Sequence, residues 1–238
     1  MTASVSPGLR EAVWQANQAL VEAGLVRLSF GNASGIDRDA GIVLIKPSGV
    51  PYDELRPEHL VAVGLEDGQV REGEARPSSD TPTHLALYRT YPTIGGIVHT
   101  HSEAATVWAQ ACLPIPPLGT THADHFRGPI PVTRPLAEAE VGADYEAATG
   151  AVIVATLDVL GLDPGDMPAV LVASHGPFAW GGDPLEAVAN AIALETVAAM
   201  AIRTYALNPA VQPMAGYLLE RHFRRKHGAD AYYGQRRR

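Results

Sequence analysis

The apolar and polar positions of this chain follow two periods, and the first third contains both. Apolar residues recur at helical spacing and predict a helix over residues 9–23. Residues 25–30 (LVRLSF) predict a strand that runs into a small-residue turn at 31–35 (GNASG). Residues 36–47 and 59–73 each contain two apolar runs around a polar turn with a glycine, which is typical of an antiparallel hairpin.

Helices dominate the rest of the chain. Residues 77–84 (PSSDTPTH) open with capping residues and a proline, as the start of a helix does. Beyond them the pattern predicts a strand over 97–101, which carries His99 and His101, and a helix over 103–111. Two long helices are predicted over 136–160 and 184–206, with a strand over 169–176 between them. Hairpins mixed with crossover helices predict a mixed sheet flanked by helices, in one domain. The sequence lacks the strict alternation and the G-x-G-x-x-G motif of a Rossmann fold.

Composition narrows the class of protein. The 238 residues are 46% hydrophobic and 18% charged, enough to bury a large core. A net charge of −8 argues against nucleic acid as a partner, and the basic run Arg236–Arg238 is expected to be a solvated tail. The single cysteine, Cys112, suits a reducing compartment. Because we find no apolar run of roughly 18 residues and no signal peptide, we expect a soluble, cytoplasmic protein without membrane contact.

Two histidines one residue apart, His99 and His101, are the strongest chemical signal. Side chains two positions apart on a strand point to the same face, so two imidazoles would lie side by side. His175 follows another apolar strand at a Gly-Pro turn, and Asp80 precedes a helix. Three imidazoles and a carboxylate suit Zn²⁺, with Mn²⁺ or Co²⁺ as alternatives. His84, one helical turn after Asp80, is a competing ligand that we expect either to pack beside the site or to support a ligand from behind.

Each of these residues also has a simpler interpretation. A lone His-x-His is more often a pair of hydrogen-bonded core histidines than a pair of ligands. An aspartate before Thr-Pro most often caps the following helix, and a histidine at a strand end can simply be hydrogen-bonded. The joint pattern, rather than any single residue, favours the metal site.

Three loops rich in small residues predict a phosphate site. Their candidate residues are Gly31, Asn32, Lys46, Ser48, Gly49, Ser78 and Ser79. Backbone N–H groups and hydroxyls in such loops bind phosphate oxygens, and a lysine adds a point charge. Each loop alone is more often a plain turn, so the prediction depends on their occurrence together with a metal site.

Seven segments, in order from about residue 8 to 235, resemble a known group of proteins. They are GNASGIDRDAG, IKPSGV, PSSDTPTH, GGIVHTHS, GTTHAD, SHGPFAWG and KHGADAYYGQ. Together they resemble the class II aldolase/epimerase superfamily, and several are shared with fuculose- and rhamnulose-phosphate aldolases. The aspartate in PSSDTPTH, the GTTHAD segment and the AYYGQ tail are similar to the L-ribulose-5-phosphate 4-epimerase branch. The resemblance implies a three-layer α/β/α fold with a central mixed, largely antiparallel sheet over residues 1–238.

The resemblance also implies roles for individual residues. It places the metal ligands at Asp80, His99, His101 and His175. It places the substrate and phosphate contacts at the loop residues above, with Lys46 nearby, and the acid/base pair at Asp124 and Tyr233. Further pocket positions are Thr120, Glu146 and His222. It implies a homotetramer with four-fold symmetry and active sites between subunits, with the tail 228–238 reaching a neighbour. We expect Asp124 and Tyr233 to meet across that interface.

The implied activity is inversion at C4, which interconverts L-ribulose 5-phosphate and D-xylulose 5-phosphate. The C4 hydrogen is not next to the carbonyl, so direct proton abstraction is difficult. Retro-aldol cleavage of C3–C4 followed by aldol re-addition avoids this difficulty. A divalent metal stabilises the enediolate as a Lewis acid, and one acid/base group is needed on each side.

Two other classes of protein stay open. A class II sugar-phosphate aldolase would release its aldehyde instead of turning it over. A non-catalytic interaction module, as in adducin heads, would have no need of the intact ligand set. A His-x-His cupin oxygenase does not fit, because long helices do not suit a jelly roll. The sequence leaves open whether the pathway is L-arabinose or L-ascorbate breakdown.

Overall fold

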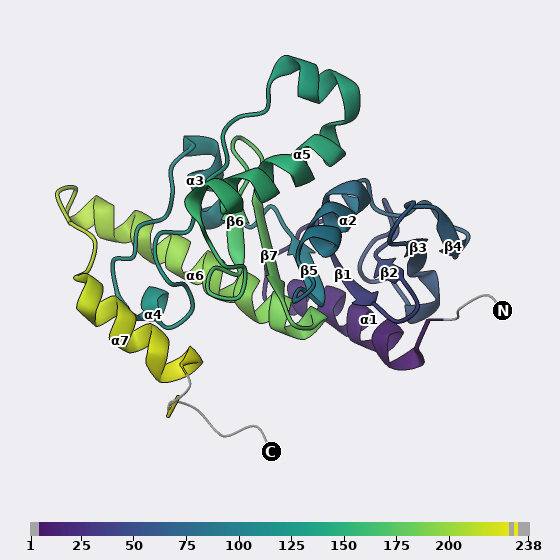
Figure 1. The fold of residues 1–238 in the computed structure, drawn as a ribbon, viewed down its shortest axis with the longest axis horizontal. Helices are drawn as coiled ribbons and strands as arrows, with labels where there is room; N and C mark the ends of the chain where they lie inside the picture. The colour runs from purple at the N-terminus through teal and green to yellow at the C-terminus, as the bar shows by residue number, and fades with distance from the viewer. Residues whose placement is uncertain (1–4, 229–230, 233–238) are drawn as a thin grey trace.

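The computed structural model describes residues 5–228 and 231–232. The strands of this part of the chain form one seven-stranded sheet in the order β4-β3-β2-β1-β5-β7-β6 (Figure 1). The strands are β1 (Asn32–Asp37), β2 (Ile42–Ile45), β3 (Val61–Gly64), β4 (Val70–Glu72), β5 (Gly96–His99), β6 (Ala169–Leu171) and β7 (Pro177–Gly181). All their pairings are antiparallel, and a parallel contact occurs in the isolated bridge between Val132 and Leu171. The expected largely antiparallel sheet is confirmed.

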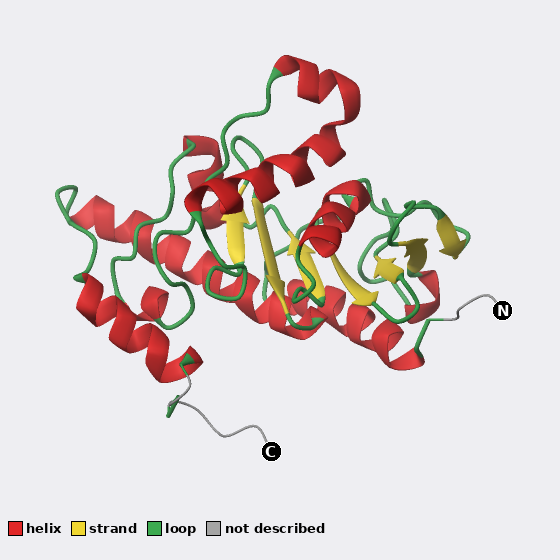
Figure 2. Ribbon diagram, in the orientation of Figure 1, coloured by secondary structure: helices red, strands yellow, loops and turns green. Residues whose placement is uncertain are grey.

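Helices cover both faces of the sheet, as the red and yellow elements of Figure 2 show. The helices are α1 (Pro7–Glu22), α2 (Thr81–Thr90), α3 (Glu103–Ala111), α4 (Thr120–Ala123), α5 (Glu138–Leu160), α6 (Pro184–Leu207) and α7 (Gly216–His227), with a 3₁₀ turn at Pro57–His59. Alternation along β5 separates the two layers. Val98 packs in one core cluster with α1, α3 and α6, whereas Ile97 packs in another with α2 and α5. This is the expected three-layer arrangement.

Several predicted elements are confirmed, with boundaries shifted by a few residues. The helix expected over 9–23 is α1, which begins at Pro7 because the Ser6 hydroxyl accepts a hydrogen bond from the N–H of Leu9. The hairpin expected over 36–47 is the turn between β1 and β2, and that expected over 59–73 is β3–β4. The helices expected in the second half are α2, α3, α5 and α6.

The strand predicted over 25–30 is wrong. That segment has no regular structure, and the small residues that follow it, read as a turn, form β1. Close helix packing explains their size: a Cβ on Gly35 would lie 2.8 Å from Pro184 Cγ and 2.8 Å from Val13 Cγ2. A central strand under α1 and α6 therefore needs small side chains, whereas Leu28 in the preceding loop is 80% exposed.

Strand ends near the histidines also differ from the prediction. β5 ends at His99, so His101 lies beyond it, and β6 ends at Leu171 rather than at 176. The chain turns through Ser174, in the left-handed region at φ 59°, and returns as β7, which the sequence reading missed. α4 and α7 were also missed: α4 is a single turn, and α7 buries only Phe223.

One helix contradicts the expectation that no segment is apolar and long enough to span a membrane. α6 meets that criterion by length and composition, with a mean hydropathy of 1.6 over its most apolar window, 44% of which is buried. Its packing identifies it as a core helix. Ala187, Leu194 and Ala198 belong to the cluster that also contains β5 and β7 residues.

Candidate metal centre and substrate cleft

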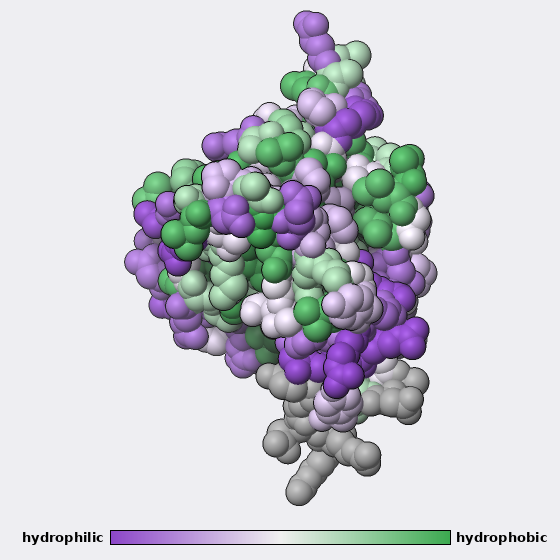
Figure 3. Space-filling model, turned by 90° about the vertical axis from the view of Figure 1, so that its left-hand side faces the viewer, coloured by the Kyte–Doolittle hydropathy of each residue, from purple (hydrophilic) through white to green (hydrophobic). Residues whose placement is uncertain are grey.

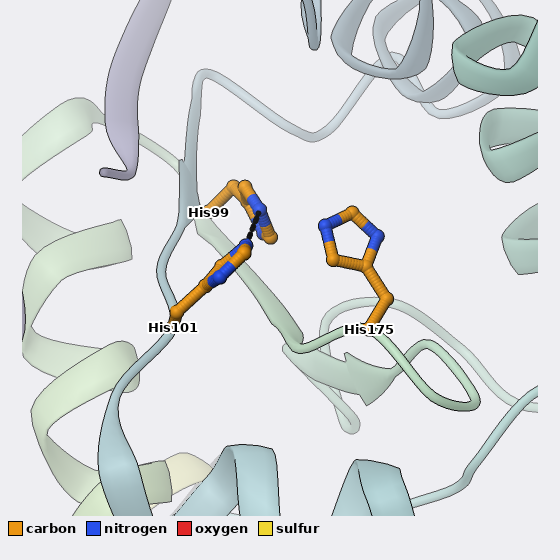
Figure 4. Close-up of side chains that lie close together, drawn as sticks. All are labelled: His99, His101 and His175. Atoms are coloured by element: carbon orange, nitrogen blue, oxygen red, sulfur yellow. Dashed lines mark hydrogen bonds between the residues drawn. The ribbon is translucent and has the colours of Figure 1, made fainter. Parts of the chain in front are cut away.

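Three histidines converge where β5 and the β6–β7 turn end. His99 closes β5, His101 precedes α3, and His175 lies in the turn (Figure 4). Sheet register pairs His99 with Phe178, on which its ring stacks at 4.2 Å between centroids. The turn approaches closely because residue 176 is glycine: a Cβ there would lie 2.8 Å from the Thr100 carbonyl oxygen. The loss of strand structure after His99 therefore does not separate the two histidines.

Their ring nitrogens form a compact set. One ligand atom from each histidine lies within 4.8 Å of the others, and the Nε2 atoms of His99 and His101 are 3.1 Å apart. The His99 Nδ1–H donates to the Pro177 carbonyl at 3.0 Å, which leaves the Nε2 lone pair facing the cluster. Nitrogens converging in this way suit a divalent cation.

Burial favours the uncharged form of two of these histidines. It lowers the pKa of His101, to which the charge of His99 contributes, and it lowers that of His175 to about 4, assisted by His99 and His101. Histidines bind a metal as neutral imidazoles, so these two rings are in the binding form at neutral pH. The donor set therefore fits the metal expected from the sequence.

Asp80 lies in the same cleft but outside the compact group of ligand atoms. It sits at the cap position of α2 without accepting a capping hydrogen bond, so the simple helix-cap interpretation is not supported. Its Oδ2 accepts instead from Asn32 Nδ2 at 2.6 Å. Burial would raise the pKa of Asp80, but His99, His84 and the Asn32 hydrogen bond lower it below the usual value. Asp80 is thus an anion beside the histidines.

A cleft of about 380 Å³ surrounds the histidines and brings together most of the predicted substrate residues. Its lining includes Gly31, Asn32, Lys46, Ser48, Gly49, Ser78, Ser79, Asp80, Glu146 and the three histidines. Some predicted donors are already used: the N–H groups of Ser48 and Ser78 bond to the carbonyls of Arg76 and Lys46. The serine hydroxyls, rather than these N–H groups, are left to contact an anion.

Lys46 is a buried cation with weak partners. Its side chain is 1% exposed; Nζ lies 3.4 Å from the Pro47 carbonyl oxygen and 4.7 Å from the centre of the Tyr52 ring. Burial lowers the pKa of Lys46 to about 8. A buried ammonium is stabilised by an anion, so this position suits a phosphate group.

The predicted acid/base residue Asp124 lies elsewhere, against α7. It follows α4, which Thr120 begins, and none of Thr120, Asp124 and His222 is among the described residues that line the cleft. Arg225 donates to both Asp124 oxygens at 3.0 and 2.7 Å, and His222 Nδ1 is 3.1 Å from Oδ1. Burial would raise the pKa of Asp124, but these two partners lower it. Tyr233, the other predicted acid/base residue, lies outside the described residues.

Two residues at these sites were missed by the sequence reading. The Tyr145 hydroxyl is 3.0 Å from His175 Nδ1 inside the cleft, and Arg225 forms the bidentate contact with Asp124. The tyrosine adjoins the predicted Glu146, which is the one signal that could have pointed to it. Arg225 stands in a run of basic residues that looks like a solvated helix face.

Comparisons with known proteins agree with this geometry. A sequence profile of the family described as "Class II Aldolase and Adducin N-terminal domain" matches residues 11–202. The L-ribulose-5-phosphate 4-epimerase UlaF of Salmonella paratyphi B is 53% identical over 228 residues, which cover 96% of this chain and 99% of that protein.

Solved structures show the same fold. An L-fuculose 1-phosphate aldolase superposes with a TM-score of 0.77 at 24% identity, covering 92% of this chain and 95% of that one. The L-fuculose-1-phosphate aldolase from Thermus thermophilus gives 0.65 at 26% identity, covering 87% and 98%. The profile match, the extent of the sequence identity and the shared fold lead to one conclusion: the chain belongs to the class II aldolase and adducin N-terminal domain family.

Proposed function

We propose that this protein is a metal-dependent isomerase that interconverts L-ribulose 5-phosphate and D-xylulose 5-phosphate by inverting C4. The observation that carries the proposal is one cleft that holds both a cluster of three histidines and a buried, weakly partnered lysine. Such a cleft offers a site for a divalent cation and a site for a phosphate. The 53% identity to a protein named for this reaction selects it among reactions of sugar phosphates.

His99, His101 and His175 are the proposed metal ligands, with Asp80 as the fourth. Zn²⁺ is the preferred ion, and Mn²⁺ or Co²⁺ would also fit such donors. The ion, when bound, would supply Lewis-acid stabilisation of the negative charge that develops on the substrate oxygens at C2 and C3.

The remaining cleft residues orient the substrate in this proposal. Lys46 and the hydroxyls of Ser48, Ser78 and Ser79 bind the phosphate, beside the backbone of Gly31 and Gly49. Asn32 has a different part, because both its amide hydrogens are used by Ser78 and Asp80 and its buried Oδ1 has no partner among the described residues. It can therefore accept a hydrogen bond from a sugar hydroxyl. Thr120, Glu146 and His222 are further contact positions.

Proton transfer is assigned to Asp124 and Tyr233. A base removes the proton of the C4 hydroxyl, the C3–C4 bond breaks, and its electron pair passes to the C2 oxygen to form an enediolate. The glycolaldehyde phosphate turns its other face, the enediolate adds back, and the second group protonates the new C4 alkoxide. Because Arg225 and His222 keep the pKa of Asp124 low, the aspartate is in the ionised form that a base needs, and the same low pKa makes it a weak proton acceptor while these partners are in place.

The position of Asp124 favours an active site shared between subunits. If the cleft binds the substrate, a second chain must bring Asp124 to it, since Asp124 lines a different part of its own chain. We propose a homotetramer with four-fold symmetry in which the tail 228–238 reaches the neighbour. Exposed apolar side chains on α6 are available for such an interface, including Leu207 at 89% and Met200 at 48%. Figure 3 shows green apolar surface between purple regions on the side of the molecule that faces left in Figure 1.

A product assay tests the proposed reaction. Purified protein with Zn²⁺ is incubated with L-ribulose 5-phosphate, and the products are separated by chromatography. We expect D-xylulose 5-phosphate to accumulate and the mixture to approach equilibrium from either sugar. Release of dihydroxyacetone and glycolaldehyde phosphate would instead identify an aldolase, and no turnover with any of the three metals would favour an interaction module.

The remaining expectations follow from this proposal. We take residues 1–238 as one domain, because the sheet joins strands from both halves of the chain. We propose a soluble cytoplasmic location, since α6 gives its apolar side to the core. Cell fractionation of a native source would check it.

A further inference from the structure

His84 is a buried histidine beside the cleft for which the proposed function gives no role. It lies on α2, one turn after Asp80, and is 0% exposed. Its Nδ1 is 2.7 Å from Ser34 Oγ, and Ser34 Oγ is 2.8 Å from the Tyr88 hydroxyl. Its Nε2 has no hydrogen-bond partner among the described residues. A buried polar atom without a partner is costly, so this nitrogen indicates a partner that comes within reach when the neighbouring cleft binds its ligand.

Both ends of this hydrogen-bonded chain are uncharged. Burial raises the pKa of Tyr88, and it lowers the pKa of His84 to about 3 although Asp80 acts in the opposite direction. A neutral imidazole carries one hydrogen, on Nδ1 or on Nε2. Whether Nε2 donates or accepts a hydrogen bond therefore depends on which tautomer is present.

The neighbours of His84 favour the hydrogen on Nε2. In that arrangement the Tyr88 hydroxyl donates to Ser34, Ser34 donates to Nδ1, and the N–H of Ile97 hydrogen-bonds to the tyrosine oxygen. In the reverse arrangement Nδ1–H donates to Ser34 and Ser34 to Tyr88, whose own hydrogen then finds no acceptor among the described residues. The first arrangement leaves one buried polar group unsatisfied and the reverse leaves two. His84 Nε2 is thus a buried donor.

Asp80 is the anion to which the His84 Nε2–H can donate a hydrogen bond. Asp80 and His84 lie close enough for each to influence the other's pKa, and His99 influences both. The His84 ring also meets Phe178 edge-on at 6.0 Å, and Phe178 stacks on His99. His84 is therefore packed against the same structure that carries the cluster.

We propose that His84 is a positioning residue whose Nε2–H donates to the Asp80 carboxylate and holds it for the ion bound by the three histidines. Asn32 Nδ2 already donates to Asp80 Oδ2, so the carboxylate would be held by two donors. This inference rests on the proposed function in one respect, namely that the cluster binds a metal. The tautomer of His84 can be measured without it.

Nitrogen-15 NMR of the full-length protein, metal-free and Zn²⁺-loaded, tests the tautomer. The His84 signals are assigned by their loss in His84→Gln. We expect a protonated Nε2 and an unprotonated, hydrogen-bonded Nδ1 in both forms, and a larger share of the other tautomer in Tyr88→Phe. A wild-type spectrum with the hydrogen on Nδ1 would overturn the proposal.

Zinc affinity, measured by competition with a chelating dye, tests the positioning role. His84→Phe keeps a ring but removes the donor, and we expect about 10- to 100-fold weaker binding, the usual cost of losing a group that supports a ligand. His84→Gln, which can place an N–H near the Nε2 position, should recover most of that loss. His122→Phe is the matched control, because His122 is also buried but bonds the Gly128 carbonyl outside the cleft.

Zinc binding by His84→Phe at wild-type affinity would refute the positioning role. Should His84→Phe lack a cooperative thermal transition, Ser34→Ala replaces it, and a loss of affinity without loss of fold is expected there. Failure of the wild-type protein to bind zinc would contradict the proposed function, whereas the metal-free NMR spectrum would still decide the tautomer.

Discussion

The ionisable groups of the cleft have few partners, whereas those at the α4–α7 contact are paired with one another. In the cleft, His101 and His175 are kept neutral by burial, and the Lys46 ammonium has only a carbonyl and an aromatic ring nearby. At the α4–α7 contact, Asp124 is held by Arg225 through both oxygens and by His222. The cleft therefore retains groups that can bind a ligand, whereas the Asp124 carboxylate at the α4–α7 contact already has its hydrogen-bond partners.

This difference separates two tasks of the proposed reaction. A metal binds to free lone pairs, and a phosphate binds to an ammonium without strong partners, so the cleft is suited to binding both. A carboxylate with a lowered pKa is ionised at neutral pH, the form that a base needs before it accepts a proton. Because the two regions do not adjoin within one chain, the comparison itself predicts that a complete active site needs two chains.

The largest effect should come from removing a histidine of the cluster. His99→Asn is expected to lower kcat/KM for epimerisation at least ~10³-fold, since Lewis-acid stabilisation contributes several kcal/mol. Bound zinc should fall with it, while the thermal transition should persist because the change is local. The product assay, metal analysis and thermal unfolding measure these effects, with the exposed His59→Asn as control. Full activity in His99→Asn would remove the cleft from the mechanism.

Asp124→Asn is expected to cost about 10²- to 10⁴-fold, the range for a lost acid/base group. Co-expression with His99→Asn gives the sharper result. If each site takes its histidines from one chain and Asp124 from the next, random mixing should leave about a quarter of the sites intact in a cyclic oligomer. Mixed oligomers, isolated with two affinity tags, that stay inactive would contradict the division between chains.

Lys46→Met should raise KM about 10- to 100-fold, because a hydrogen bond between charged groups is lost, with a smaller change in kcat. In the wild-type protein the lysine is cationic below its pKa of about 8 and loses its charge above it. KM should therefore rise as pH passes through about 8, and this rise should be missing in Lys46→Met. A KM that is independent of pH in both proteins would exclude the lysine from phosphate binding.

The smallest effect concerns Arg225. Its hydrogen bonds lower the pKa of Asp124, so Arg225→Gln should let that pKa rise toward its ordinary value. A base must be unprotonated, so activity falls as pH falls through its pKa, and the acidic limb of the pH–rate profile should move to higher pH. Stopped assays that extend below pH 4, where the lowered pKa of Asp124 lies, would measure the shift. An unmoved limb would mean that a different group is the base.

Local spacing made the binding half of the site predictable. His-x-His places two rings together whether or not the strand continues, which is why the cluster survives the end of β5 at His99. The loops proposed to bind phosphate were also recognisable as candidates, since small residues with Lys46 occur within short segments, and they do line the same cleft. Asp124 was identified only through the resemblance to a family, because a loop aspartate carries no local signal of its own.

Non-local packing accounts for what was missed. The small residues of β1 resemble a turn until α1 and α6 are placed against Gly35. Arg225 looks like part of a solvated basic face, and its contact with Asp124 exists only once α7 packs on α4. Tyr145 likewise reaches His175 from α5, a helix that is distant in sequence from the β6–β7 turn.

The three histidines come from the end of β5 and from the distant turn between β6 and β7. An ion held between them would tie two remote stretches of chain and close a long loop, much as a covalent cross-link does. Binding to the native state alone would also add stability that grows with the logarithm of the free ion concentration. The metal supply of the cell would then set the lifetime of the folded enzyme as well as its rate.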